Sequence, residues 1–211
     1  MSRTMDAVLF DYGGVFTESP FTVVEEIGLS MGATPGLLME IVFGPYGDDT
    51  DHPWHQLERG EITLPAAREA IILRGNEQGL DTDVYKFFTA MGGSSGIRED
   101  FVQLVRDLKA AGYKTGMITN NVLEFREHWM QTLPIDELFD SVVDSSEVGL
   151  RKPDPAIFHH ALAELQVPPK RAIFLDDFEG NVVAARATGL HGILVRSEFQ
   201  AAIDEVRELI K

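Results

Sequence analysis

The sequence predicts an α/β fold in which a doubly wound, Rossmann-like parallel sheet carries an inserted block of helices. Several short apolar runs lack the alternation of a half-exposed strand, which is typical of strands buried on both faces of a parallel sheet. From residue 97 onward these runs alternate with helical patterns, as right-handed crossover connections require. Residues 19–92 contain helical patterns only, which indicates an insertion after the first strand.

The composition is that of an ordinary globular protein. The chain has 211 residues, of which 44% are hydrophobic and 25% charged, so it can bury a core without covalent staples. It has no cysteine, which excludes disulfides and thiolate metal sites. The 34 acidic and 18 basic residues give a net charge of −16, which disfavours nucleic acid and anionic membrane partners. No long apolar segment follows the N-terminus, and we therefore expect a cytoplasmic protein.

The predicted sheet has four clear strands and one weaker strand. The clear strands are 7–11, 114–119, 172–176 and 192–195, and the weaker one is 141–144. Helical spacing of apolar residues predicts helices around 101–108, 157–165, 182–185 and 206–210. Gly112 and Gly189 follow two of these patterns and are typical of helix ends.

The inserted block has five predicted helices, at 21–31, 35–43, 54–59, 64–74 and 83–91. Glycine and proline separate them, and no convincing strand lies between them. We therefore expect two domains: a core of residues 1–18 and 93–211, and a helical cap of residues 19–92. Hinges near 16–20 and 92–96 would let the cap close over a ligand.

Acidic and polar residues stand where the predicted strands end. Open parallel sheets bind ligands at the carboxyl ends of their strands, at the point where the strand order reverses. This rule places Asp11, Thr119, Asn120, Asp176 and Asp177 together, although more than 150 residues separate the first from the last. Adjacent acids at a buried strand end repel one another, and a bound cation is the simplest account of them.

Four motifs with this arrangement resemble the haloacid dehalogenase superfamily. In chain order they are residues 10–15 (FDYGGV), 117–121 (MITNN), Lys152 within 149–153 (GLRKP), and 174–177 (FLDD) with Asn181 after it. The helical insertion is similar to the cap of subfamily I. Residues 54–62 look like the cap of a subgroup that holds sugar-phosphate phosphatases and the phosphatase domain of soluble epoxide hydrolase.

The resemblance implies a magnesium-dependent phosphatase that acts on a small phosphorylated metabolite. Asp11 would attack phosphorus and form an aspartyl-phosphate that water then hydrolyses. Mg²⁺ would be held by Asp11, Asp177 and the backbone carbonyl of Gly13, with Asp176 as a further ligand. Of the acidic pair, Asp177 is the preferred direct ligand.

The remaining motif residues would bind the phosphate or orient the ligands. Lys152 would supply positive charge to both the nucleophile and the phosphate. Thr119, by its hydroxyl, and Asn120, by its backbone N–H, would bind phosphate oxygens at the start of the next helix. Asn181 lies one helical turn after Asp177 and would orient that carboxylate.

Gly13 departs from the pattern of most phosphatases in this superfamily. Those enzymes carry an aspartate two residues after the nucleophile, and it protonates the leaving group. Glycine cannot transfer a proton, and such help is commonly worth about 10²–10⁴ in rate. The substrate could have a good leaving group, such as a sugar-1-phosphate or an acyl phosphate. Alternatively, a cap or hinge residue could substitute, the candidates being His55, Glu18 and Asp51.

Other functions stay open at this point. A 2-haloacid dehalogenase also lacks the second acid and needs no metal, but the pair Asp176 and Asp177 argues against it. A degenerate, non-catalytic member that binds a phosphorylated ligand is a second alternative, and phosphotransfer as in mutases is a third. The sequence leaves monomer and homodimer equally open.

Overall fold

The computed structural model describes residues 3–91 and 96–211. Its centre is one parallel sheet of five strands in the order β3-β2-β1-β4-β5. The strands are β1 (Ala7–Phe10), β2 (Lys114–Thr119), β3 (Ser141–Asp144), β4 (Ala172–Asp176) and β5 (His191–Leu194). The predicted α/β fold is confirmed, and the weakest of the predicted strands, 141–144, is present.

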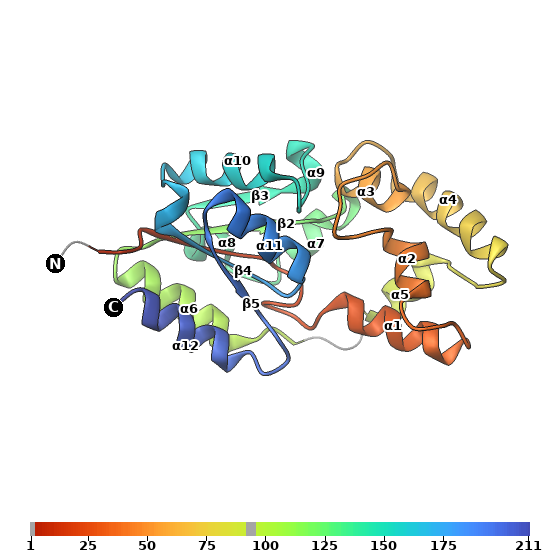
Figure 1. Cartoon of the computed structure of the whole chain (residues 1–211), viewed down its shortest axis with the longest axis horizontal. Helices are drawn as coiled ribbons and strands as arrows, with labels where there is room; N and C mark the ends of the chain where they lie inside the picture. Colours follow the sequence, from red (N-terminus) through yellow and green to blue (C-terminus); the bar gives the residue numbers. More distant parts are fainter. Residues whose placement is uncertain (1–2, 92–95) are drawn as a thin grey trace.

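Helices cover both faces of this sheet (Figure 1). α6 (Glu99–Ala110) and α12 (Gln200–Leu209) pack on one face, and α10 (Pro155–Leu165) and α11 (Glu179–Thr188) on the other. The side chains of β1 alternate between the two hydrophobic clusters, and all four are fully buried. Burial on both faces explains why the central strand is an uninterrupted apolar run.

Five helices stand between β1 and α6. They are α1 (Pro20–Ser30), α2 (Leu37–Phe43), α3 (Pro53–Glu58), α4 (Leu64–Glu77) and α5 (Val84–Met91), and residues 20–91 contain no strand. A proline occupies the first or second position of α1, α3 and α4, where its missing N–H costs nothing. These helices share a hydrophobic cluster and lie together at one end of the molecule, opposite both termini (Figure 1). The helical insertion is thus observed, while its boundaries as a domain stay a prediction.

Several short helical turns were not predicted. They are η1 (Leu123–Phe125), α7 (Arg126–Trp129), α8 (Ile135–Leu138), α9 (Ser145–Val148) and η2 (Pro169–Arg171). The prediction that Thr119 and Asn120 begin a helix is wrong, because residues 120–122 are not helical. Local polar contacts replace the helix there: the N–H of Asn121 donates to Ser145 Oγ, and the Asn121 side chain accepts from the N–H of Val122.

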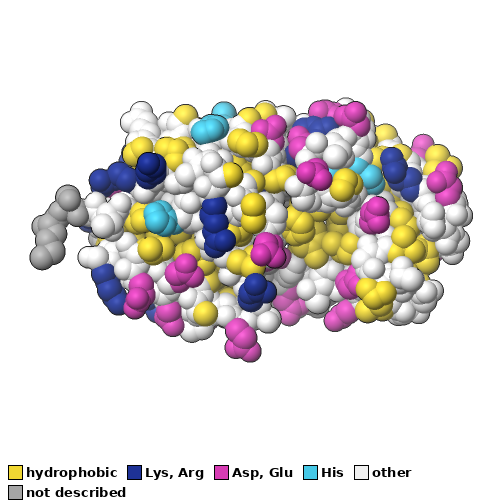
Figure 2. Space-filling model, viewed as in Figure 1, with side chains coloured by type: hydrophobic (Ala, Val, Ile, Leu, Met, Phe, Trp, Pro, Cys, Tyr) yellow, Lys and Arg dark blue, Asp and Glu magenta, His cyan; other side chains and the backbone are white. Residues whose placement is uncertain are grey.

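Acidic side chains are scattered over the face shown in Figure 2, and hydrophobic side chains gather near its middle. This group lies between the sheet end of the molecule and the end formed by α1 to α5. No helix among the described residues is long and apolar enough to cross a membrane.

Candidate active site

The strand order brings the predicted residues to one edge of the sheet. β1 lies between β2 and β4, so the order reverses beside it. Asp11 follows β1, Thr119 ends β2 and Asp176 ends β4. Parallel pairing puts these three ends side by side, as expected for the ligand-binding edge of a doubly wound sheet.

Lys152 joins this edge from the loop between α9 and α10. Its side chain is almost completely buried, and Nζ lies 2.8 Å from Asp11 Oδ1 and 2.7 Å from Asp176 Oδ2. Burial disfavours the ammonium, but the two carboxylates outweigh it and raise the pKa of Lys152. The side chain therefore holds a positive charge between the carboxyl groups of Asp11 and Asp176.

The two oxygens of Asp11 differ in their surroundings. Oδ1 accepts hydrogen bonds from Lys152 Nζ and, at 2.7 Å, from the N–H of Tyr12. Among the described residues no donor contacts Oδ2. The carboxyl is mostly buried at the floor of the site, and burial raises its pKa, opposed by Lys152 and reinforced by Asp176 and Asp177.

Asp176 is fully buried and held from three directions. Oδ2 faces Lys152, Oδ1 accepts from the N–H of Phe178 at 2.8 Å, and Asn181 Nδ2 lies 3.2 and 3.1 Å from the two oxygens. The expectation that Asn181 orients Asp177 is therefore corrected, since its amide contacts Asp176 instead. Asp177 instead lies against Gly14, in the turn that follows β1.

Asp177 rests against Gly14, a residue that the sequence analysis did not single out. A Cβ on Gly14 would lie 2.0 Å from Asp177 Cγ, and the φ of +71° also favours glycine. Gly13 is different, because a Cβ there would meet only Pro20 Cδ at 3.7 Å. Position 14 therefore requires glycine on steric grounds, and position 13 does not. The two consecutive glycines of the first motif were the signal by which the sequence could have pointed to Gly14.

The three carboxylates form a cluster that can hold a metal ion. Asp11, Asp176 and Asp177 each offer an oxygen, and these atoms lie within 4.8 Å of one another. Burial and the charge of Asp176 raise the pKa of Asp177 to about 7, although a hydrogen bond from Ser19 opposes the rise. Such mutual repulsion between buried oxygen ligands is relieved by a hard divalent cation, so the donor set fits the predicted metal.

A cavity of about 520 Å³ opens above the strand ends. Its lining includes Gly13, Thr119 and Asn120, and Thr119 is almost fully buried at its floor. His128 and Trp129 of α7 also line it. The sequence analysis missed both residues, because a four-residue helix gives no periodic signal.

The Asn120 side chain faces the loop that carries Lys152. Its Oδ1 accepts from the N–H of Lys152 at 2.8 Å, and its Nδ2 donates to the carbonyl of Lys152 at 2.9 Å. Nδ2 also lies 3.3 Å from the hydroxyl of Tyr46. Because these contacts occupy the amide, a phosphate would use the backbone N–H of Asn120, the group that the sequence analysis named.

The three candidates for the missing acid are placed differently. Glu18 lines the cavity, whereas His55 and Asp51 are not among the residues that line it. His55 is fully buried in α3, and its Nδ1 accepts from the hydroxyl of Thr50 at 2.9 Å. Burial and the charge of Arg151 lower its pKa to about 3, so it stays neutral. The structure therefore does not bring His55 to the site.

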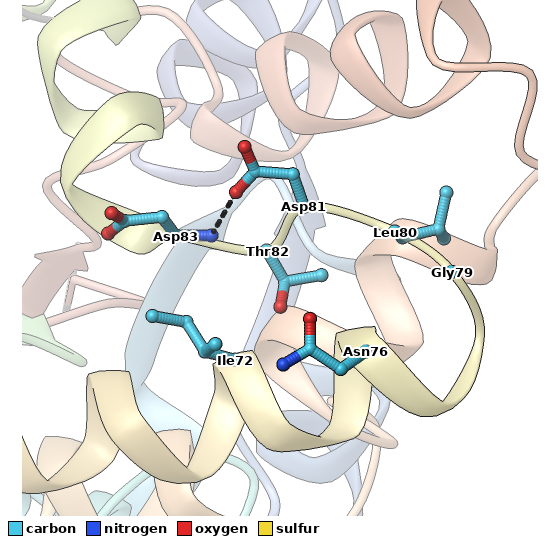
Figure 3. Close-up of a pocket in the computed structure, with 7 residues that line it drawn as sticks. All are labelled: Ile72, Asn76, Gly79, Leu80, Asp81, Thr82 and Asp83. Carbon is cyan, nitrogen blue, oxygen red and sulfur yellow. Dashed lines mark hydrogen bonds between the residues drawn. The ribbon is translucent and has the colours of Figure 1, made fainter.

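A separate hollow of about 360 Å³ lies within the helical insertion, between the end of α4 and the start of α5 (Figure 3). Asp81 and Asp83 line it, and the N–H of Asp83 donates to the carboxylate of Asp81. None of its lining residues belongs to the carboxylate cluster. The arrangement at the carboxyl end of the sheet, where a buried aspartate lies beside a lysine and an acidic pair, fits a hydrolase with an α/β fold.

The chain belongs to the haloacid dehalogenase-like hydrolase family, whose sequence model matches residues 5–189. It is 32% identical to acyl-CoA dehydrogenase family member 10 of Mus musculus over 99% of its own length, which is 19% of that protein. It is 30% identical to bifunctional epoxide hydrolase 2 of Rattus norvegicus over 75% of its length, which is 30% of that protein. The chain thus spans less than a third of either relative.

Other relatives match over nearly their whole length. A sesquiterpene phosphatase of Aspergillus oryzae is 26% identical, with 100% of this chain and 99% of that protein covered. A phosphoglycolate phosphatase of Colwellia psychrerythraea is 25% identical, with 89% and 83% covered. Family membership confirms the prediction of a hydrolase of this superfamily, and both of these relatives are named as phosphatases.

Solved structures confirm the fold. An enzyme of the same superfamily from Bacteroides thetaiotaomicron, in complex with magnesium and inorganic phosphate, aligns with a TM-score of 0.63 at 21% identity, covering 92% of this chain and 96% of that one. The L-2-haloacid dehalogenase from Xanthobacter autotrophicus aligns with a TM-score of 0.60 at 17% identity, covering 98% and 84%. At these identities the likeness concerns the fold alone.

Proposed function

We propose that the protein is a Mg²⁺-dependent hydrolase of small phosphate monoesters in which Asp11 is the nucleophile. The observation that carries the proposal is the position of Lys152 Nζ, at 2.8 Å from Asp11 and 2.7 Å from Asp176, beside the third carboxylate Asp177. A fixed ammonium and a cluster of hard oxygen ligands suit the stabilisation of a phosphoryl group in transfer.

Asp11 performs the first step. Its Oδ2, which no described donor occupies, attacks phosphorus while the bond from phosphorus to the ester oxygen breaks. The leaving oxygen takes the electron pair and a proton. A water oxygen then attacks the same phosphorus, the bond to Asp11 breaks, and the carboxylate is restored. The sum is ester plus water giving alcohol plus phosphate.

The other residues position charge around this reaction. Lys152 holds Asp11 by Oδ1, which leaves Oδ2 directed to the substrate, while Thr119 Oγ1 and the N–H of Asn120 bind phosphate oxygens. Asp11, Asp177, Asp176 and the carbonyl of Gly13 would hold Mg²⁺, which would supply the positive charge that lets an anionic nucleophile approach an anionic phosphate.

Two side chains in the cavity wall can supply the proton that the leaving oxygen takes. Glu18 and His128 both line the cavity, and either reaches solvent. Neither occupies the position of the missing aspartate. Substrates whose leaving group is a weak base therefore depend least on a proton donor, which is why acyl phosphates and sugar-1-phosphates remain in the first panel to be tested.

The test compares phosphate release with and without Mg²⁺ for the wild type, Asp11→Asn and the control Asp204→Asn, which changes an exposed aspartate on α12. We expect magnesium-dependent release from wild type and control only. Halide release from 2-haloacids without metal would instead support a dehalogenase. Phosphate binding without release on any substrate would support a non-catalytic member.

A further inference from the structure

We propose that the alcohol part of the substrate is apolar: the enzyme hydrolyses the phosphate ester of an aryl or alkyl alcohol in preference to a sugar phosphate. This inference rests on the proposed function and specifies its substrate class. It comes from the walls of the 520 Å³ cavity above Thr119 and Asn120, whose size suits a small organic molecule.

Apolar atoms form most of the exposed surface of these walls. Aromatic and aliphatic side chains from five parts of the chain contribute to it: Tyr12, Val23, Phe88, Ile97, Phe125 and Trp129. The rings of Phe88 and Phe125 pack edge to face with centroids 4.7 Å apart, and those of Tyr12 and Trp129 lie 5.2 Å apart. Two aromatic pairs thus stand around one space, an arrangement that favours an apolar group.

Several hydroxyl groups in the walls already have hydrogen-bond partners within the protein. The hydroxyl of Tyr12 lies 2.8 Å from Thr132 Oγ1, which also donates to the carbonyl of Trp129 at 2.6 Å. The hydroxyl of Thr17 donates to the carbonyl of Glu18 at 3.1 Å. A sugar ring would have to bury its hydroxyls against these satisfied groups, which is unfavourable.

Among the described residues, no lysine or arginine lines the cavity, so an anionic group of the substrate is attracted only at the phosphate end. Glu18 and His128 are the ionisable side chains that remain besides Tyr12. A second phosphate or a carboxylate on the substrate would therefore lie against apolar walls or against Glu18. The cavity therefore fits a substrate that carries one phosphate group on an apolar body.

The first experiment measures kcat/KM, in magnesium buffer, for a series of straight-chain alkyl phosphates, 1-naphthyl phosphate and glucose 6-phosphate. Each added methylene that enters the cavity should raise kcat/KM about 3- to 4-fold until the cavity is filled, because burial is worth about 0.8 kcal/mol per methylene. The expected order is long alkyl above short alkyl above glucose 6-phosphate, all esters of primary alcohols. 1-Naphthyl phosphate also gains from its better leaving group and serves only for the comparison of variants. Glucose 6-phosphate as the best substrate, or no dependence on chain length, would overturn the proposal.

A matched pair of variants on α5 locates the effect. Phe88 lines the cavity, whereas Tyr85 on the same helix is exposed and does not. Phe88→Ala should raise the KM for 1-naphthyl phosphate about 5- to 30-fold, and Tyr85→Ala should change it less than about 2-fold. Both should keep the wild-type inhibition constant of inorganic phosphate, which measures the phosphate end alone. An equal KM in the two variants would contradict the assignment.

The experiments distinguish a failure of the proposed function from a failure of the proposed substrate class. If no phosphate ester or acyl phosphate is hydrolysed, the proposed function fails. If acetyl phosphate is hydrolysed with Mg²⁺ but apolar esters are not preferred, the function stands and the apolar substrate class is excluded.

Discussion

Glu58 and Arg151 form an ion pair inside the protein, with Arg151 Nε 2.8 Å from Glu58 Oε2 and both side chains almost completely buried. The hydroxyl of Tyr46 and the indole N–H of Trp54 each donate to Glu58 Oε1 at 2.8 Å. Glu58 ends α3 of the helical insertion, and Arg151 precedes Lys152. The pair therefore ties the insertion to the loop that supplies the lysine of the site.

Breaking this pair should destabilise the protein strongly. Arg151→Met leaves a buried carboxylate with no cation, and we expect a loss of about 3–5 kcal/mol in the free energy of unfolding, measured with urea. Arg106→Met, which breaks an exposed pair with Glu137, should cost less than about 1 kcal/mol. The double variant Glu58→Gln with Arg151→Met should recover part of the loss. Equal costs at the two arginines would contradict the structure.

Lys152→Gln should abolish most turnover and, since it leaves Asp11 and Asp176 without their cation, should also lower the free energy of unfolding, so activity is measured where circular dichroism shows the variant folded. The amide cannot neutralise Asp11 and Asp176, so we expect kcat to fall by at least about 10²-fold, the cost of one electrostatic catalytic contact. Steady-state kinetics with circular dichroism will measure this, with Lys86→Gln, which breaks an exposed pair, as the control. Wild-type kcat in Lys152→Gln would show that the ammonium has no part in the reaction.

The two glycines after the nucleophile should respond differently to alanine. In Gly14→Ala the new methyl would overlap Asp177, so that carboxylate must move and the apparent affinity for Mg²⁺ should fall about 10- to 100-fold. In Gly13→Ala the methyl meets only ordinary contacts, and the affinity should stay within about 3-fold. Magnesium titration of activity and calorimetry will compare them. Equal affinities would show that Asp177 is not a ligand.

His55 makes stability depend on pH. Its pKa is about 3 in the fold, because it is buried beside Arg151, and about 6.5 in an unfolded chain. Its contribution to stability is therefore complete above pH 6.5 and is lost as the pH falls from 6.5 toward 3. Between pH 7.5 and 5 this loss should reach about 2 kcal/mol.

His55→Asn keeps an acceptor for Thr50 but binds no proton, so its unfolding free energy should fall about 2 kcal/mol less on acidification than that of the wild type. The carboxyls with raised pKa act in the opposite direction in both proteins and cancel in the comparison. The exposed His159→Asn is the control. Parallel pH curves for wild type and His55→Asn would refute the buried, neutral state.

The sequence predicted what depends on local pattern and on sheet topology. The central strand, its companion strands and the helical insertion follow from apolar runs and helical spacing, and the convergence of Asp11, Thr119 and Asp176 follows from the strand order. The resemblance to the family implied the place of Lys152 beside them. Their catalytic roles stay predictions. The contact between Gly14 and Asp177 could be predicted only by combining the glycines of the first motif with the fold.

What the sequence did not predict depends on side-chain packing between distant segments. Phe16 packs in the hydrophobic cluster on one face of the sheet and Trp54 in that of the insertion, and neither lines the cavity. The cavity wall instead uses Phe88, Phe125 and Trp129, two of which lie in short turns without periodicity. The contact of Asn181 with Asp176 also depends on the turn after β4, which spacing alone does not determine.

The central claim is that Asp11 becomes phosphorylated, and trapping the intermediate tests it most directly. A reaction with acetyl phosphate and Mg²⁺ is quenched within one turnover and reduced with borohydride, which converts an aspartyl-phosphate to homoserine, and the peptides are sequenced by mass spectrometry. The account predicts homoserine at position 11 and none in Asp11→Asn. Phosphate release with homoserine at another position, or with none at all, would contradict it.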